Sequence, residues 1–144
     1  MAIAQSVEQA IVSRASEWDG VTTATRRGGR VEFVYDGEDI GHIDDDGSLD
    51  LPLSIPVREA LVAAGRTHAH PTYPKTGWTT FDIRGQDDVE EAVRLLRLAY
   101  VYYVLEASND DGRAALADSI ALDAEMAAFD ASDDLREAMA AVAR

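Results

Sequence analysis

Three histidines are the residues of this 144-residue sequence that are best suited to chemistry. His68 and His70 are separated by one residue in a segment with strand character, so both side chains are predicted to lie on one face of a sheet. His42 lies in a second predicted strand, on the same face as Glu38. Imidazole suits Zn, Fe, Cu and Ni, so a metal ion, if the chain binds one, is expected on His42, His68 and His70. The alternative assigns one histidine to structure, one to the surface and one to a loop hydrogen bond, and no cofactor is then expected.

Two charged segments resemble ligand sites, but each has a simpler interpretation. Acidic residues alternate over 44–50 as in a calcium loop, yet an EF-hand requires Gly at its sixth position and Glu at its twelfth. Counted from the start of this segment, Gly47 is fourth and Ile55 is twelfth, so we interpret it as a solvated acidic turn. Three arginines surround two glycines over 26–30, which is the composition of an anion site. Salt bridges to neighbouring carboxylates are the preferred interpretation of these arginines.

The first half of the chain predicts a helix followed by a β-meander. Apolar residues recur at helical spacing over 3–18. After them, apolar or β-branched residues alternate with polar ones in four short runs. The expected strands cover residues 21–25, 31–35, 38–43 and 49–53. Asp36-Gly37 predicts a type I′ hairpin turn, and Pro52 makes the fourth strand edge-like.

The second half predicts a short helix, two strands and a long helix. The short helix begins at Pro56 and ends before Gly65. The strands are expected over 66–70 and 78–83, and the long helix over 89–107, preceded by an Asp87–Glu90 capping pattern. We therefore predict an α+β fold, with an antiparallel β-meander sheet packed by an N-terminal helix and a long helix. The domain covers 1–107, and an acidic, Ala-rich helical extension covers 108–144.

The charge of the chain limits its partners. Asp and Glu number 27 and Lys and Arg 13, which gives a net charge of −14. Such a surface repels the phosphates of nucleic acids and anionic membranes, and no apolar run is long enough to span a bilayer. The absence of Cys excludes disulfides and thiolate ligands, and the first residues lack the signal-peptide pattern. We therefore expect a cytoplasmic protein without nucleic-acid or membrane partners.

The kind of charge is also informative. Asp outnumbers Glu, and Lys75 is the only lysine beside twelve arginines. We interpret this composition as adaptation to molar salt, as in halophilic archaea, because the Debye length at 1 M salt is only about 3 Å and repulsion is screened. The alternative is an acidic protein of an ordinary cell, or one with a basic partner.

A family resemblance runs from about Trp18 to Tyr103. The strings EDIGHI (38–43) and DLPL (50–53) resemble the luciferase-domain family, small prokaryotic proteins that are similar to fungal luciferase. Further along, the residues that match this pattern are Arg58, Leu61, Gly65, His70, Pro74 and Thr76-Gly77-Trp78. The segment 95–100 resembles the closing helix of the family.

The resemblance implies a pocket and a type of chemistry. Fungal luciferase is a cofactor-independent oxygenase that acts on a hydroxypyrone, and such a reaction requires a base and a group that holds the substrate anion. The resemblance places His42, His70 and Trp78 in a common pocket, with Glu38 and Arg58 beside them. His42 or His70 is expected to be the general base, Arg58 to hold the anion and Trp78 to pack on the ligand.

Two hypotheses for the function follow. The chain is a small-molecule enzyme or binding protein, and the resemblance implies an oxygenase-type oxidoreductase if it is an enzyme. Alternatively, it is a non-catalytic interaction or regulatory module whose C-terminal helices form a homo-oligomer or hold a partner. One shared pocket for the two histidines and Trp78 favours the first hypothesis, and scattered histidines favour the second.

Overall fold

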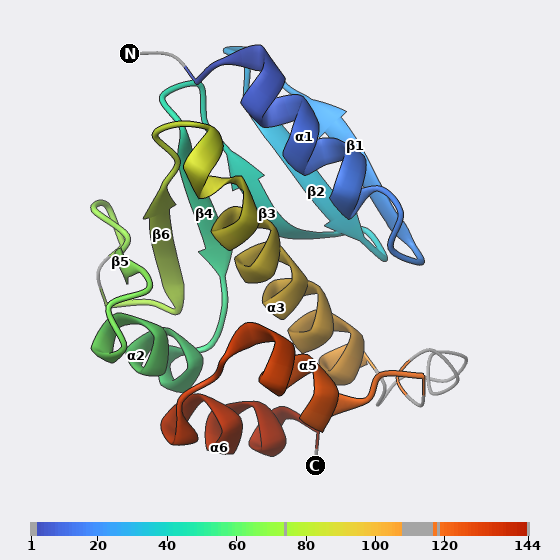
Figure 1. The fold of residues 1–144 in the computed structure, drawn as a ribbon, viewed down its shortest axis with the longest axis vertical. Coiled ribbons are helices and arrows are strands. Elements are labelled where there is room, and N and C mark those ends of the chain that lie inside the picture. Colours follow the sequence, from blue (N-terminus) through green and yellow to red (C-terminus); the bar gives the residue numbers. More distant parts are fainter. Residues whose placement is uncertain (1–2, 74, 108–116, 118, 144) are drawn as a thin grey trace.

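The computed structural model describes residues 3–73, 75–107, 117 and 119–143, which form one antiparallel sheet with helices packed on it (Figure 1). The strands are β1 (Val21–Thr25), β2 (Val31–Tyr35), β3 (Glu38–Ile43), β4 (Ser48–Pro52), β5 (His68–Ala69) and β6 (Trp78–Asp82). The helices are α1 (Gln5–Ala15), α2 (Ile55–Ala63), α3 (Val89–Ala107), α5 (Leu122–Phe129) and α6 (Asp133–Val142), with a 3-10 turn, η1 (Gln86–Asp88), before α3. The strand order is β1-β2-β3-β4-β6-β5. The predicted α+β class is confirmed.

The meander forms where alternation predicted it. The bounds of β1, β2 and β3 coincide with the predicted ranges, and successive strands pair as antiparallel hairpins. Asp36 and Gly37 have φ values of 56° and 78°, as both central residues of a type I′ turn require. Asp also tolerates this left-handed conformation better than most residues, so the local sequence suits the turn.

The prediction that the fourth strand lies at an edge is wrong. β4 lies inside the sheet, between β3 and β6 (Figure 1). Pro52 is the last residue of the strand, opposite Trp78, so the ring interrupts the ladder only where the strand ends. The predicted strand over 66–70 is shorter than expected, since only His68 and Ala69 pair with β6. The short β5 therefore forms the edge.

The two faces of the sheet differ. Helices α1 and α3 lie side by side across one face, where Phe33, Ile43 and Leu49 are fully buried (Figure 1). Gly41 lies on this face, and a Cβ atom there would come within 3.0 Å of Leu51 and Leu96. The glycine therefore lets α3 approach β3 closely. The polar residues of the same strands are directed to the opposite face by the two-residue period of a strand.

Helix α3 begins differently from the prediction. The Asp87–Glu90 pair does not cap it, because η1 precedes Val89 and the Asp88 carboxylate accepts the backbone N–H of Arg84 at 2.8 Å. Glu90 instead accepts a hydrogen bond from Arg14 on α1 at 2.6 Å. The acidic residues of this first turn therefore tie α3 to its neighbours.

Helix α3 is buried on more than its predicted stripe. The predicted apolar face packs on α1 and the sheet, whereas further residues are buried on the sides that α5 and α6 contact. These additional buried residues are Leu95, Leu98, Val101, Tyr102 and Leu105. No described helix has the length and apolar character that a bilayer crossing requires.

The C-terminal helices pack against the rest of the chain. Met126 and Phe129 of α5 and Leu135 and Met139 of α6 are buried, and their helices contact α2 and α3. Burial of each such side chain stabilises the fold by about 2 kcal/mol. The predicted domain boundary follows the end of α3. Residues 108–116 and 118, with which the extension would begin, lie outside the described residues.

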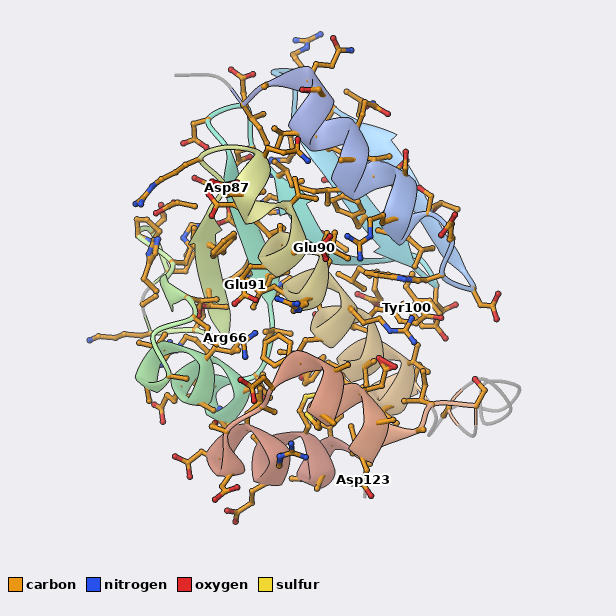
Figure 2. All side chains as sticks on the ribbon, viewed as in Figure 1. Arg66, Asp87, Glu90, Glu91, Tyr100 and Asp123 are labelled. Atoms are coloured by element: carbon orange, nitrogen blue, oxygen red, sulfur yellow. The ribbon has the colours of Figure 1, made fainter. Side chains whose placement is uncertain are left out.

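Arg66 lies just after α2 and joins α3 to α5. Its guanidinium forms a bidentate ion pair with Glu91 of α3, at 2.8 and 2.9 Å, and donates to the carbonyl of Phe129 at 2.7 Å (Figure 2). The same group lies 3.8 Å from the centroid of the Phe129 ring. Arg66 thus caps the C-terminal end of α5 while Glu91 neutralises its charge.

We expect Arg66→Ala to lower the free energy of unfolding by about 3 kcal/mol, because Glu91 and the Phe129 carbonyl lose their partner in a half-buried place. Urea unfolding followed by circular dichroism measures the change. Arg94→Ala is the matched control, since Arg94 is 52% exposed and reaches Glu91 only at 3.9 Å. Equal stability of the two variants would contradict this role of Arg66.

Candidate functional site

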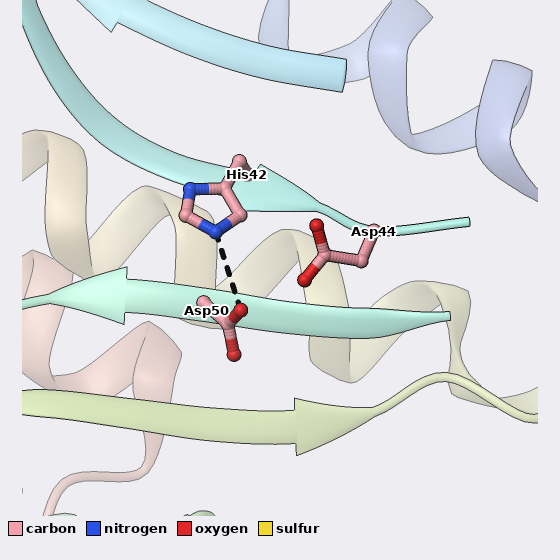
Figure 3. Close-up of side chains that lie close together, drawn as sticks. All are labelled: His42, Asp44 and Asp50. Atoms are coloured by element: carbon pink, nitrogen blue, oxygen red, sulfur yellow. Dashed lines mark hydrogen bonds and ion pairs between the residues drawn. The ribbon is translucent and has the colours of Figure 1, made fainter. Parts of the chain in front are cut away.

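A row of polar side chains crosses the face of the sheet opposite α3. His42 of β3 pairs with Asp50 of β4, and Asp50 pairs with Thr80 of β6. The exposed fractions of these three residues are only 5%, 3% and 2%. Figure 3 shows His42 and Asp50 on the near side of the strands, with helices behind the sheet. Buried polar groups require partners, and this row supplies them within the sheet.

A carboxylate lies at each ring nitrogen of His42. Nδ1 is 3.0 Å from Asp39 Oδ2, and Nε2 is 3.2 Å from Asp50 Oδ2. Thr80 donates its hydroxyl to the other Asp50 oxygen at 2.7 Å. A carboxylate accepts hydrogen bonds, so both ring nitrogens of His42 are donors and the ring is an imidazolium.

A β-bulge brings Asp39 to His42. Phe33 pairs with Gly41 but Val34 pairs with Asp39, so Ile40 is one extra residue in β3. Strict alternation would put Asp39 and His42 on opposite faces, and Glu38 on the face of His42. The extra residue reverses this assignment, which is a known use of bulges beside functional sites. The predicted pairing of His42 with Glu38 on one face is therefore wrong.

The charges of His42 and Asp50 stabilise each other. Burial lowers the pKa of His42, but the hydrogen bonds to Asp39 and Asp50 outweigh it and raise the pKa from 6.5 to about 9. Burial raises the pKa of the Asp50 carboxyl, but the hydrogen bonds from His42 and Thr80 outweigh it and hold the pKa below its ordinary value. The pair is thus ionised at neutral pH.

His70 approaches the same carboxylate from the edge of the sheet. Its Nε2 atom is 3.5 Å from Asp50 Oδ2, and its Nδ1 atom accepts the backbone N–H groups of Thr72 and Tyr73 at 3.1 and 3.3 Å. Because Nδ1 accepts, the proton of a neutral ring lies on Nε2 and points to Asp50. The side chain of His70 is 15% exposed, so it is the histidine of this group that solvent reaches most readily.

Trp78 lies beside both histidines. Its ring centroid is 5.5 Å from that of His42 and 6.0 Å from that of His70. The backbone just before it is held tightly, since a Cβ atom on Gly77 would lie 1.7 Å from the Leu53 carbonyl oxygen. Glycine is required there, and it fixes the start of β6 against the end of β4.

Comparison with known proteins agrees with this part of the chain. Residues 37–99 match the family model of the luciferase domain. The match begins at the turn before β3, ends within α3, and includes His42, Asp50, His70 and Trp78. It supports the predicted resemblance to the luciferase-domain family. No curated protein and no solved structure gave a significant match.

The structure brings three of the predicted site residues together: His42, His70 and Trp78 lie in one cluster. Their predicted catalytic and binding roles stay predictions. Arg58 of α2 donates to the Thr76 carbonyl and so contacts the segment between His70 and Trp78. Glu38 lies elsewhere and lines a hollow with Tyr103 and Glu106.

His68 is directed to a separate partner. Its Nε2 atom is 3.1 Å from Asp82, and the side chain is half exposed. The predicted ligand set of His42, His68 and His70 is not the one that the structure assembles. Over the described ranges, the three possible ligands that lie together are His42, Asp44 and Asp50 (Figure 3).

The sequence analysis missed Asp50 as a member of the site. The predicted strand over 49–53 contains Asp50, and the structure places it in β4, but the acidic pattern over 44–50 is interpreted as solvated and Asp50 is not among the predicted site residues. The apolar residues Leu49 and Leu51 on either side of Asp50 could have identified it, because alternation in a strand places Asp50 on the face opposite to theirs. The salt bridges predicted for the three arginines over 26–30 are confirmed for two of them, since Arg26 pairs with Glu32 at 2.7 Å and Arg30 pairs with Asp44 at 2.8 Å.

The pKa of His42 predicts how stability depends on pH. Below pH 6.5 both the folded and the unfolded chain hold the proton, and the stabilisation is complete. As the pH rises from 6.5 to 9, the unfolded chain releases it first, so the free energy of unfolding falls by about 3 kcal/mol. Urea unfolding at intervals across this range measures the slope.

His42→Gln removes this slope, because the group that binds the extra proton is gone. His68→Gln is the matched control and keeps it, since His68 lies outside the buried row. A slope that survives in His42→Gln would show that another group is responsible.

Proposed function

We propose that the chain is a small-molecule-binding protein of the luciferase-domain type, and that it removes a proton from an acidic organic ligand. The observation that carries this proposal is the buried Asp50 carboxylate shared by two imidazoles, with Trp78 beside both rings. An imidazole oriented by a buried carboxylate is a common arrangement for a general base. The family match over residues 37–99 supports the same assignment.

The proposal assigns the base to His70. Both nitrogens of His42 lie on carboxylates, so His42 has no lone pair for a substrate and serves to keep Asp50 ionised. In His70, Asp50 holds the proton on Nε2 and leaves the Nδ1 lone pair as the basic site. An acidic hydroxyl would replace the two long contacts from Thr72 and Tyr73 at that atom. His70 then carries a proton, and its charge is matched by Asp50.

Trp78 and Arg58 are the proposed binding residues. The indole of Trp78 is only partly buried and offers a flat apolar surface next to His70. Arg58 fixes the backbone at Thr76 and adds a positive charge beside that segment. We assign no role to Glu38, which lies at the other hollow.

As an enzyme, this arrangement would support an oxygenase reaction without a cofactor. Removal of a proton from an enol or hydroxypyrone gives an electron-rich anion, and the anion itself supplies the electrons that reduce oxygen. The protein's tasks are to bind, to deprotonate and to shield that anion.

The interaction-module hypothesis has less support. The apolar residues of α5 and α6 that would form a helical interface are already buried against α2 and α3. Helices α5 and α6 therefore stabilise the fold of this chain, and the apolar residues named above are not exposed to a partner.

We also propose that the surface is adapted to concentrated salt. The net charge of −14 and the single lysine support this. Like charges also face each other across elements, because Glu59 of α2 and Asp134 and Glu137 of α6 line one hollow. Their repulsion opposes the packing of these two helices in dilute buffer and is screened in molar salt.

We expect the full chain to bind 4-hydroxy-6-methyl-2-pyrone, a simple hydroxypyrone, with quenching of Trp fluorescence. His70→Ala should weaken binding about tenfold or more, because the ligand loses its proton acceptor. His68→Ala is the matched control and should bind as the wild type does. Trp78→Phe should remove most of the quenching and Trp18→Phe little of it.

Oxygen consumption by the same samples separates an oxygenase from a binding protein. Equal binding by His70→Ala and His68→Ala would contradict the assigned site.

For salt adaptation, we expect the unfolding temperature to rise by about 10 °C between 0.1 and 3 M KCl, as screening removes repulsion. Calorimetry measures the shift. Glu137→Gln should raise the unfolding temperature at low salt and reduce the gain. An unfolding temperature that is constant or falls with KCl would rule out this adaptation.

A further inference from the structure

The geometry points to a site for one divalent transition-metal ion, bound by His42 Nε2 and the carboxylates of Asp44 and Asp50. This inference goes beyond the proposed small-molecule chemistry and does not depend on it. It also differs from the ligand set that the sequence predicts, since two carboxylates from the β3–β4 hairpin replace His68 and His70.

The three side chains converge on one point. One ligand atom from each lies within 4.8 Å of the others, and Figure 3 shows all three on the same side of the hairpin. An ion with metal–ligand bonds of about 2.0–2.2 Å separates its ligand atoms by about 3–4 Å. The His42–Asp50 separation of 3.2 Å already falls in this range.

Each ligand is already oriented by a second partner. Asp39 accepts from Nδ1 of His42, which leaves Nε2 to face the site. Thr80 donates to one oxygen of Asp50, and Arg30 donates to one oxygen of Asp44 at 2.8 Å. A histidine whose other nitrogen binds a carboxylate, and carboxylates that are themselves hydrogen-bonded, form the usual outer shell of a metal centre.

The charge of the group suits a dication. Asp39, Asp44 and Asp50 contribute three negative charges and Arg30 one positive charge. A metal ion on Nε2 displaces the proton that His42 otherwise donates to Asp50, and with His42 then neutral the net charge of the group is −2. One divalent ion brings it to zero and so compensates the buried charge of Asp50.

The site also has a route from solvent. Asp44 lines a hollow of about 530 Å³ between the β1–β2 and β3–β4 turns, where four carboxylates (Glu32, Asp44, Asp45 and Asp46) lie with three arginines (Arg26, Arg27 and Arg30). The side chain of Asp44 is 31% exposed and faces this hollow. An ion therefore reaches the site without passing through the core.

The donor set selects the class of metal. One imidazole nitrogen favours Zn²⁺, Co²⁺ or Mn²⁺ over Mg²⁺ and Ca²⁺, which prefer oxygen ligands only. His70 stays outside the ligand set because its Nδ1 accepts backbone N–H groups and its Nε2 holds the proton. Three protein ligands leave positions open for water or an acidic ligand.

The test is a metal titration of the full chain after treatment with a chelator, with no organic ligand present. We expect Co²⁺ to bind one ion per chain and to give visible d–d absorption, and Zn²⁺ to displace it, while excess Mg²⁺ does not. Asp44→Asn should weaken Co²⁺ binding about tenfold or more. Its matched control is Asp45→Asn, a neighbouring exposed carboxylate outside the group, and it should bind as the wild type does.

His42→Gln should abolish binding, and Asp44→Asn keeps the test valid if His42→Gln fails to fold. His68→Ala should leave the titration unchanged. The inference is overturned if the wild type binds neither Co²⁺ nor Zn²⁺, if Mg²⁺ competes equally, or if Asp44→Asn binds as tightly as Asp45→Asn. Failure of the pyrone experiment would not affect this result, because the two assays share no ligand.

Discussion

The buried negative charge of Asp50 is the constraint on which the rest of the site depends. An unpaired carboxylate in the middle of a sheet would be strongly destabilising, so its neighbours must neutralise and hydrogen-bond it. The strand order supplies them, because β3 and β6 lie on either side of β4 and place His42 and Thr80 opposite Asp50. His70 then finds its acceptor already ionised. The bulge at Ile40 completes the row by turning Asp39 towards the far side of the His42 ring.

The two faces of the sheet differ in character, because one is packed by helices and the other holds the polar row of the candidate site. On one face, Gly41 lets α3 pack closely on β3, and the apolar residues of the strands are buried there. No helix among the described elements covers the polar row on the other face, which is closed by its own side chains and by the segment that leads to Trp78 (Figures 1 and 3). A rigid strand scaffold holds the imidazoles and carboxylates within narrow limits, as a proton-transfer or metal site requires.

Local patterns in the sequence predicted the elements well, since β1, β2 and β3 and the Asp36-Gly37 turn follow from residues close in the chain. The features that depend on contacts between residues far apart in the sequence were not predictable from such local patterns. The interior place of β4 follows from its pairing with β6, which no short window contains. A bulge changes which face of the sheet the residues on either side of it share. Strict alternation therefore predicts Glu38 on the face of His42, whereas the bulge at Ile40 places Asp39 there. His42, His70 and Trp78 were grouped by the family resemblance, and spacing alone would have grouped His68 with them.

The residues of the candidate site and the residues that stabilise the elements around it come from different parts of the chain. The family match covers Asp39, His42, Asp50, His70 and Trp78, and it ends within α3. The second half of α3 is apolar on sides that the sheet does not cover, and α5 and α6 bury those sides. Arg66 lies inside the matched segment but binds the Phe129 carbonyl outside it, while Arg30 lies outside and orients Asp44 inside. The outer elements therefore do more than cover apolar surface, because one of them positions a carboxylate at the edge of the site itself.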